Sequence, residues 1–353
     1  MYIIDELKNY PVNWTDGMRI GSKDFIAADQ AWEDAIRDVR ISLLQGIQFG
    51  LLPPLRDSRD KSSYPKFHVD PSRNELTLLE CRAITEGGYR IEITEALHHE
   101  FQIPAALPTL KPEAKEDIDV YITYILDGQG ASGPVSSDAP PRRLYRSPGY
   151  ELSAFARKDK IGLSGVNHMK IAEFRWVNNT FEQDKSYIPP CFTISSHPEL
   201  LERHQRIGGV FNAMLELGLK LAQDYRTDTR NDVRDGALWL EILLQHLSAG
   251  IWTFNDLLPE RSPIFTVVFL KNWTQYVQTT AAIRKNNPLL AKNLESLQPL
   301  LKSIAKDKFD YADLRRAFDT MEEAVVKIYR WFQELEEAFR KSFVPRVEEL
   351  KEK

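Results

Sequence analysis

The last part of the sequence carries an apolar repeat that few folds can accommodate. Apolar residues recur there at alternating steps of four and three, at Leu314, Phe318, Met321, Val325, Ile328, Phe332, Leu335 and Phe339. A repeat of about 3.5 residues keeps one stripe of a helix against its neighbours only in a bundle or coiled coil. At 1.5 Å per residue, this stripe is roughly 37 Å long.

Phenylalanine at several positions of this seam bears on the number of helices around it. Such side chains are too bulky for a tight pair of helices, so we expect more than two helices around the axis. Those helices can belong to this chain or to other copies of it, because a heptad seam is also a means of subunit association. We predict a homotrimer that is assembled through the helices.

The same spacing runs through the whole second half of the chain, which is therefore predicted to be helical. Ser196 and Glu199 match a capping box with Pro198 in the first turn, so a helix should begin there. Three further seams follow, at Leu200, His204, Ile207, Phe211, Met214, Gly218, Leu221 and Tyr225, at Leu240, Leu244, Leu247, Ile251 and Phe254, and at Val267, Leu270, Thr274, Val277 and Ala281. We assign residues 196–343 to a helical bundle and residues 344–353 to a charged tail.

Residues from about 60 to 195 show the patterns of strands instead. Residues 76–85 and 89–94 flank Glu-Gly-Gly, and residues 169–177 and 180–181 flank Asn-Asn, so both pairs are predicted hairpins. Short connections of this kind give antiparallel pairing.

Two further segments complete the predicted strands. Residues 117–126 alternate apolar and polar side chains, as a half-buried strand does, and residues 191–194 form a last short strand. We predict a β-sandwich within residues 1–195 and an α+β fold overall, with strands first and helices second.

Residues 128–149 are rich in Gly, Ser, Pro and charge and have no apolar period, which predicts a flexible loop. Gly128, Gly130 and Gly133 match a dinucleotide-binding fingerprint in spacing. Pro134 and the prolines at 140 and 141 cannot open the helix that would hold a pyrophosphate. A nucleotide site is therefore disfavoured.

Composition narrows the classes of function. The chain has 353 residues, enough for about two domains. Its 46 basic and 51 acidic residues give a net charge of -5, which does not favour binding to nucleic acid or anionic lipid. Neither a signal peptide nor a run of about 20 apolar residues is present in the sequence, so we predict a cytoplasmic protein without lipid insertion.

Candidate catalytic and metal-ligating residues are sparse. Cys81 and Cys191 lack the spacing of a zinc site, and the 98–100 His-His-Glu cluster is expected to be polar surface. Ser164 misses the nucleophile-elbow pattern by one residue. We predict no catalytic, metal or cofactor residues, and a binding or scaffold protein rather than an enzyme.

Three ordered blocks of sequence resemble the TssK family of type VI secretion baseplate subunits. The first lies in residues 12–25 and keeps Trp14, Asp16, Gly17, Met18, Ile20 and Phe25 of the family signature. The second runs from residues 169–172 through residues 184–190, which include Tyr187, Ile188, Pro189 and Pro190, to the helix start at residues 193–200. The third is residues 309–318, where Tyr311 stands in place of the usual His.

This resemblance implies a fold and a role. It implies a β-sandwich shoulder that docks on the baseplate wedge (TssF/TssG-like subunits), a helical neck that trimerises, and a head domain that engages the membrane complex. Past residue 343 only a charged tail remains, so we expect a short form without the head and leave the membrane-side contact open.

The expected function is a structural adaptor that links the wedge to the membrane-side complex, at the inner face of the inner membrane. The residues of the first two blocks are its interface candidates. Two alternatives stay open: a receptor-binding or tip component of a phage-like tail, and a hydrolase or nucleotide-binding enzyme that uses the Gly128 loop.

Overall fold

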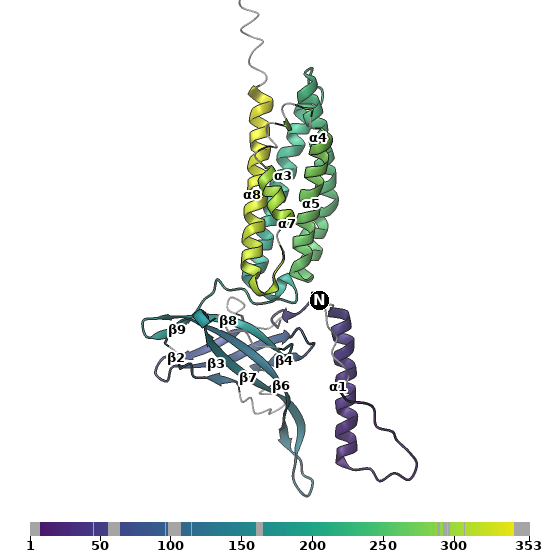
Figure 1. The fold of residues 1–353 in the computed structure, drawn as a ribbon, viewed down its shortest axis with the longest axis vertical. Helices are drawn as coiled ribbons and strands as arrows, with labels where there is room; N and C mark the ends of the chain where they lie inside the picture. The colour runs from purple at the N-terminus through teal and green to yellow at the C-terminus, as the bar shows by residue number, and fades with distance from the viewer. Residues whose placement is uncertain are drawn as a thin grey trace, which may run out of the picture. The chain divides into compact units, whose positions relative to one another are not determined.

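The computed structural model describes residues 8–44, 46–55, 64–95, 97, 107–113, 115–159, 165–284, 286–287, 290–291, 295, 297–306 and 308–341. The chain forms two compact units, Met1–Pro198 and Glu199–Lys353, called here the sheet unit and the helical unit. Strands dominate the first unit and helices make up the second (Figure 1). The predicted α+β class is confirmed.

The sheet unit begins with helix α1 (Ser22–Leu44) and contains two antiparallel sheets. One sheet comprises β1 (Gly50–Leu51), β2 (Lys66–Asp70), β3 (Glu75–Ile84), β4 (Arg90–Ile93) and β5 (Thr109–Leu110). The other has the order β7-β6-β8-β9, with β6 (Ile118–Val135), β7 (Arg143–Ala156), β8 (His168–Val177) and β9 (Thr180–Gln183).

The two sheets bury their apolar faces against each other. Leu76 and Leu78 of β3 and Val120 and Ile122 of β6 are fully buried. Phe174 of β8 meets a ring of the other sheet, Phe67 of β2, at 5.2 Å between centroids. This alternation of buried and outward residues is that of a β-sandwich, as predicted.

Both predicted hairpins are present, with turn residues in conformations that favour them. Gly88 has a φ of 76° between β3 and β4, and Asn178 and Asn179 have φ of 50° and 62° between β8 and β9. The predicted strand over residues 191–194 is wrong. Cys191 makes one bridge to Leu51, after which Ile194–Ser196 form a 3-10 turn because Ser196 Oγ accepts a hydrogen bond from Thr193 N at 3.1 Å.

The predicted loop over residues 128–149 is also wrong in most of its length. Residues 128–135 and 143–149 extend β6 and β7, with Gly130 opposite Ser147 and Ser132 opposite Tyr145. Strand pairing uses backbone groups, so it does not require the apolar period that this stretch lacks. Register shifts interrupt the ladder and account for its irregular sequence.

The helical unit contains α3 (Pro198–Tyr225), α4 (Asn231–Trp252), α5 (Pro263–Ile283), α7 (Gln298–Lys306) and α8 (Leu314–Lys341), with short turns η3 (Thr253–Leu257), η4 (Leu258–Glu260) and η5 (Tyr311–Asp313). The long helices lie side by side (Figure 1). Edge-on ring contacts join them, Trp239 of α4 to Trp331 of α8 at 5.4 Å and Phe211 of α3 to Trp273 of α5 at 5.5 Å. The predicted bundle is confirmed.

The seam of α8 is buried by helices of the same chain. All of its residues, Leu314, Phe318, Met321, Val325, Ile328, Phe332, Leu335 and Phe339, are at most 5% exposed in the single chain. This seam therefore has no free face for another copy, and a trimer would need a different surface.

His204 lies inside the bundle, on the seam of α3. Its Nε2 is 2.8 Å from the carbonyl oxygen of Phe254, and its ring stacks on the Phe254 ring at 4.2 Å. Burial lowers the pKa of His204 to about 4, and the hydrogen bond to Phe254 offsets only part of this effect. The imidazole is thus a neutral core residue at neutral pH.

We predict that His204 makes the bundle less stable as the pH falls from 6.5 towards 4. In this window the unfolded chain binds a proton that the folded chain excludes, so the free energy of unfolding falls by about 2 kcal/mol between pH 7 and pH 5. Urea unfolding at both pH values measures this loss. His204→Gln should remove that share of the pH dependence, and His246→Gln should retain it. Equal pH dependence in the wild type and His204→Gln would contradict the prediction.

Candidate functional site

The first signature block forms a turn that leads into α1. Met18 N donates to the carbonyl of Thr15 at 3.2 Å, and Gly17 holds a φ of 80°, which favours glycine. Asp24 Oδ2 accepts a hydrogen bond from Gly21 N at 2.8 Å and so fixes the start of the helix.

This block leaves large apolar side chains in solvent. Trp14 and Phe25 contact each other at 6.1 Å between ring centroids, yet they are 48% and 58% exposed. Ile20 and Asp16 are also exposed, and Met18 is half-buried. Clustered apolar side chains of this kind are typical of a docking surface.

The opposite face of α1 fixes the helix to the rest of the sheet unit. Its buried residues include Ala31, Asp34, Ile41 and Leu44. Asp34 accepts hydrogen bonds from the backbone and side-chain nitrogens of Asn9, both at 2.9 Å. Arg37 donates to the hydroxyl of Tyr89 at 2.7 Å and lies over its ring. The helix is therefore held in place and presents its other side outward.

A groove of about 520 Å³ runs between α1 and the strands. Tyr89, Tyr124 and Tyr150 line it, the first two stacked at 5.0 Å. Tyr150 accepts a hydrogen bond from Glu92 N at 3.1 Å, and burial raises the pKa of Tyr150 to about 12. Basic and acidic side chains share the walls, so the groove has no strong preference for one sign of charge.

The second signature block is structural. Ile188, Pro189 and Pro190 are buried. Pro190 accepts a hydrogen bond from Leu51 N at 2.7 Å, and a side chain on Gly50 would lie within 2.2 Å of Pro190. These three residues position the segment between the sheet and the first bundle helix. They are not exposed to a partner.

Tyr187 of the same block borders a network of charged side chains on the outer face of the second sheet. Its ring lies under the ammonium group of Lys170 at 4.6 Å. Its hydroxyl is buried and has no hydrogen-bond partner among the described residues. Burial raises the pKa of Tyr187 well above its ordinary value.

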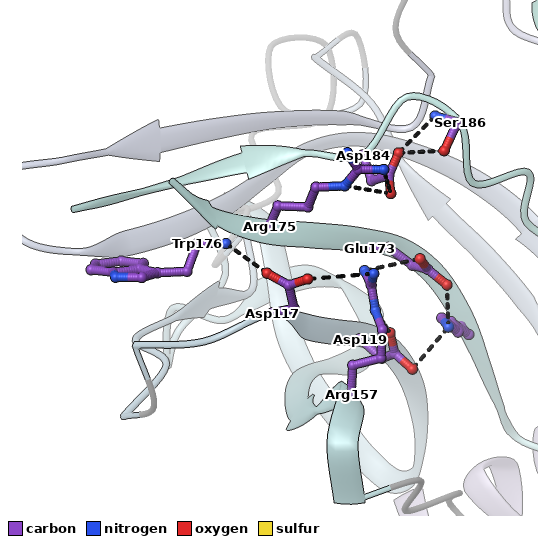
Figure 2. A network of polar contacts seen from close by, with 9 residues as sticks. Asp117, Asp119, Arg157, Glu173, Arg175, Trp176, Asp184 and Ser186 are labelled. Atoms are coloured by element: carbon purple, nitrogen blue, oxygen red, sulfur yellow. Dashed lines mark hydrogen bonds and ion pairs between the residues drawn. The ribbon is translucent and has the colours of Figure 1, made fainter. Parts of the chain in front are cut away.

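Arg157 is the centre of this network (Figure 2). It pairs with Asp117 at 3.7 Å, Asp119 at 3.3 Å and Glu173 at 2.9 Å. Lys170 adds contacts to Asp119 at 2.8 Å and Glu173 at 2.7 Å. Burial alone lowers the pKa of Lys170, but these hydrogen bonds outweigh it, so the pKa is raised.

A second part of Figure 2 surrounds Asp184. This carboxylate accepts hydrogen bonds from Arg175 Nη2 at 2.7 Å and from Ser186 N at 3.0 Å. Burial alone raises the pKa of Asp184, but the hydrogen bonds from Ser186 and Arg175 outweigh it and lower the pKa. The network pairs its charges internally, as a structural cover of the sheet does, and gathers no uncompensated acid–base pair.

In the helical unit, the outer face of α4 and α5 carries little charge, because its acidic residue Glu241 is half-buried and pairs with Arg226 at 3.8 Å. Their exposed residues from Leu238 onward are Leu238, Gln245, His246, Ser248, Ala249 and Trp252 on α4, and Phe265, Val268, Asn272, Gln275, Thr279, Ala282 and Ile283 on α5. The helices are direct neighbours, because the rings of His246 and Tyr276 stack at 3.8 Å. We call this surface the α4–α5 face. The sequence analysis did not predict it, although its exposed α5 residues follow steps of three and four along the helix.

The metal, thiol and nucleotide candidates of the sequence find no matching geometry in the part of the chain that the structure describes. No group of three or more His, Cys, Asp or Glu side chains there could hold a metal ion. Cys81 and Cys191 are buried, and burial raises the pKa of both thiols. The Gly128 fingerprint runs along β6, where a nucleotide site would need a helix. His98, His99, Glu100 and Ser164 lie outside the described residues.

Within the described residues, no helix combines the length and apolar composition that a membrane span requires. No protein-family model and no curated protein sequence matches the chain. Its fold, by contrast, is similar to solved structures.

A crystal structure of TssK superposes with a TM-score of 0.57 at 11% identity, over 90% of this chain and 69% of that one. A chain of the TssK-TssF-TssG baseplate subcomplex of the type VI secretion system, from cryo-electron microscopy, gives 0.56 at 13% identity over 92% and 100%. A chain of the type VI secretion baseplate complex gives 0.58 at 14% identity over 92% and 99%. The chain therefore has the TssK fold, and the expected resemblance to TssK is confirmed at the level of the fold.

We predict that Arg157→Met destabilises the sheet unit by about 1–3 kcal/mol, because it leaves three half-buried carboxylates without their shared cation. Chemical denaturation followed by tryptophan fluorescence measures the loss. Lys158→Met is the matched control, since Lys158 is largely exposed and pairs with Glu116 at 2.7 Å; we expect it to cost at most about 1 kcal/mol. Equal losses of unfolding free energy in both variants would show that the Arg157 network stabilises the sheet unit no more than one exposed ion pair does.

Proposed function

We propose that this chain is a structural subunit of a type VI secretion baseplate. The observation that carries the proposal is the likeness to TssK and to chains of baseplate complexes, which extends over 90% or more of this chain. The protein acts as an adaptor between the baseplate wedge and the membrane-side complex, at the inner face of the inner membrane.

Its wedge partners are TssF- and TssG-like subunits, and the contact uses the first signature block. This assignment is supported by the exposure of Trp14 and Ile20 in the segment before α1 and of Phe25 in the first turn of α1, a helix that is held in place. The buried Ile188, Pro189 and Pro190 are not part of the contact.

Co-expression with the TssF- and TssG-like subunits of the same genome tests the proposal. We expect the proteins to co-purify and Trp14→Ala to weaken the complex about thirtyfold or more, because truncation of an aromatic anchor costs about 2 kcal/mol or more. The melting temperature of the isolated variant should be unchanged, since Trp14 is half-exposed. A lower melting temperature with intact binding would assign Trp14 to the fold, and a wild type that does not bind would refute the proposed function.

The protein assembles as a homotrimer through the α4–α5 face. In a ring of identical chains, residues near the rotation axis meet their own copies, so charges there repel each other. The exposed residues of the α4–α5 face are uncharged and its half-buried Glu241 pairs with Arg226 at 3.8 Å, whereas the outer face of α8 carries exposed ion pairs such as Glu323–Lys327 and Glu336–Arg340. Gln275 and Asn272 can both donate and accept, so each can pair with its own copy.

We expect Val268→Glu combined with Gln275→Glu to yield monomers, because the pair places like charges at the axis. Light scattering should give about 122 kDa for the wild type, three times 40.7 kDa, and one third of this for the variant. Leu219→Glu combined with Gln333→Glu is the control with the same chemical change on exposed residues of other helices, and it should remain a trimer. A wild-type monomer at micromolar concentration, or a trimeric variant, would exclude this face.

A further inference from the structure

Helix α1 carries a second, outward seam with the spacing of a coiled coil. Its members follow steps of four and three and are all exposed, at Phe25, Asp29, Trp32, Ile36, Val39 and Leu43. Trp32 and Leu43 are 70% and 75% exposed, which is high for side chains of this size in a folded chain. The seam spans roughly 27 Å.

The geometry of this seam selects the kind of partner. Because Arg37 donates to Tyr89 and Ile41 lies beside Gly88, the opposite face of α1 is fixed to the β3–β4 hairpin, and the helix cannot turn to bury its outer seam there. Side chains at a repeat of about 3.5 residues fit the holes of another helix. Sheets and extended peptides present a repeat of about two and do not match it.

Asp29 decides between a second copy and a different protein. It lies between Phe25 and Trp32 on the seam and has no ion-pair partner among the described residues. Around a rotation axis, each Asp29 would meet its own copy within an apolar seam, where an unpaired charge is costly. The α4–α5 face differs from α1 on this point, because its exposed residues are uncharged and its half-buried Glu241 is paired with Arg226.

We propose that the α1 seam binds an amphipathic helix of a wedge subunit that places a Lys or Arg opposite Asp29. The inference rests on the proposed function and adds to it the secondary structure and charge of the bound segment. Continuity supports the wedge as the source, because Phe25 belongs both to this seam and to the exposed pair with Trp14. The charged residue fixes the register of the two helices, as a buried polar residue does in coiled coils.

The test compares wedge binding by the full-length wild type, Trp32→Glu combined with Ile36→Glu, Asp29→Lys and Asp38→Lys. The last variant makes the same charge change as Asp29→Lys on a different face of α1. We expect the two seam variants to lose at least tenfold in affinity for the co-expressed wedge subunits, and Asp38→Lys to bind like the wild type. Circular dichroism checks that all variants remain folded, which the exposed seam positions should allow and which is required of Asp38→Lys because Asp38 is half-buried.

A photo-crosslinking residue at position 36 identifies the bound segment. We expect crosslinks to one helix of a wedge subunit with a basic residue within a turn of the crosslinked position, and exchange of that residue for Asp should restore binding to Asp29→Lys. Crosslinks to a second copy of this chain, or wild-type affinity in the seam variants, would overturn the inference and leave the proposed function intact. If the wild type itself binds no wedge subunit, both this inference and the proposed function are refuted. This outcome is distinguishable from the others because it is seen without any substitution.

Discussion

Burial of the α8 seam inside its own bundle is the constraint on which the other surfaces depend. Once Phe318, Phe332 and Phe339 are fully buried within one chain, the strongest apolar stripe of the sequence is no longer available for assembly. The outer faces of the bundle helices are in contact with water, and α3 and α8 carry ion pairs there, such as Arg206–Glu322. The largely apolar α4–α5 face and the outward seam of α1 are then candidates for contact with partners, because no described segment of the chain covers their exposed apolar residues.

Sequence periodicity predicted the fold class, both hairpins and the internal seams, because each depends on local pattern and burial. It did not predict that β6 and β7 continue through residues 128–149, since backbone pairing leaves no trace in side-chain hydropathy. It also assigned the α8 seam to assembly without being able to tell whether the neighbouring helices are in the same chain. That distinction is a matter of tertiary structure, and the spacing of the seam is the same in both cases.

The candidate site was predicted only in part, because a sequence motif does not show whether its residues are exposed or buried. The resemblance pointed to Trp14 and Phe25, which the structure brings together in solvent, and to Pro189 and Pro190, which it buries. Exposure cannot be read from a motif, so the two blocks looked equivalent in the sequence. The seam of α1 was visible as a spacing of four and three, but the run is short. Only the structure shows that α1 buries its opposite face and leaves this seam exposed. The Arg157 network joins residues from three separate segments and has no sequence signature.

The short bridge between Leu51 and Cys191 has a mechanical consequence. Leu51 donates to Pro190 at 2.7 Å and accepts from Phe192 at 2.8 Å, so the segment that leaves the sheet unit towards α3 is tied to β1 by two backbone hydrogen bonds in parallel orientation. Tension applied to the chain beyond this point acts along the bridge and loads both bonds together, as in shear, instead of peeling them apart one by one. Resistance to pulling is then set by the rate at which this clamp opens rather than by the equilibrium stability of the sandwich behind it.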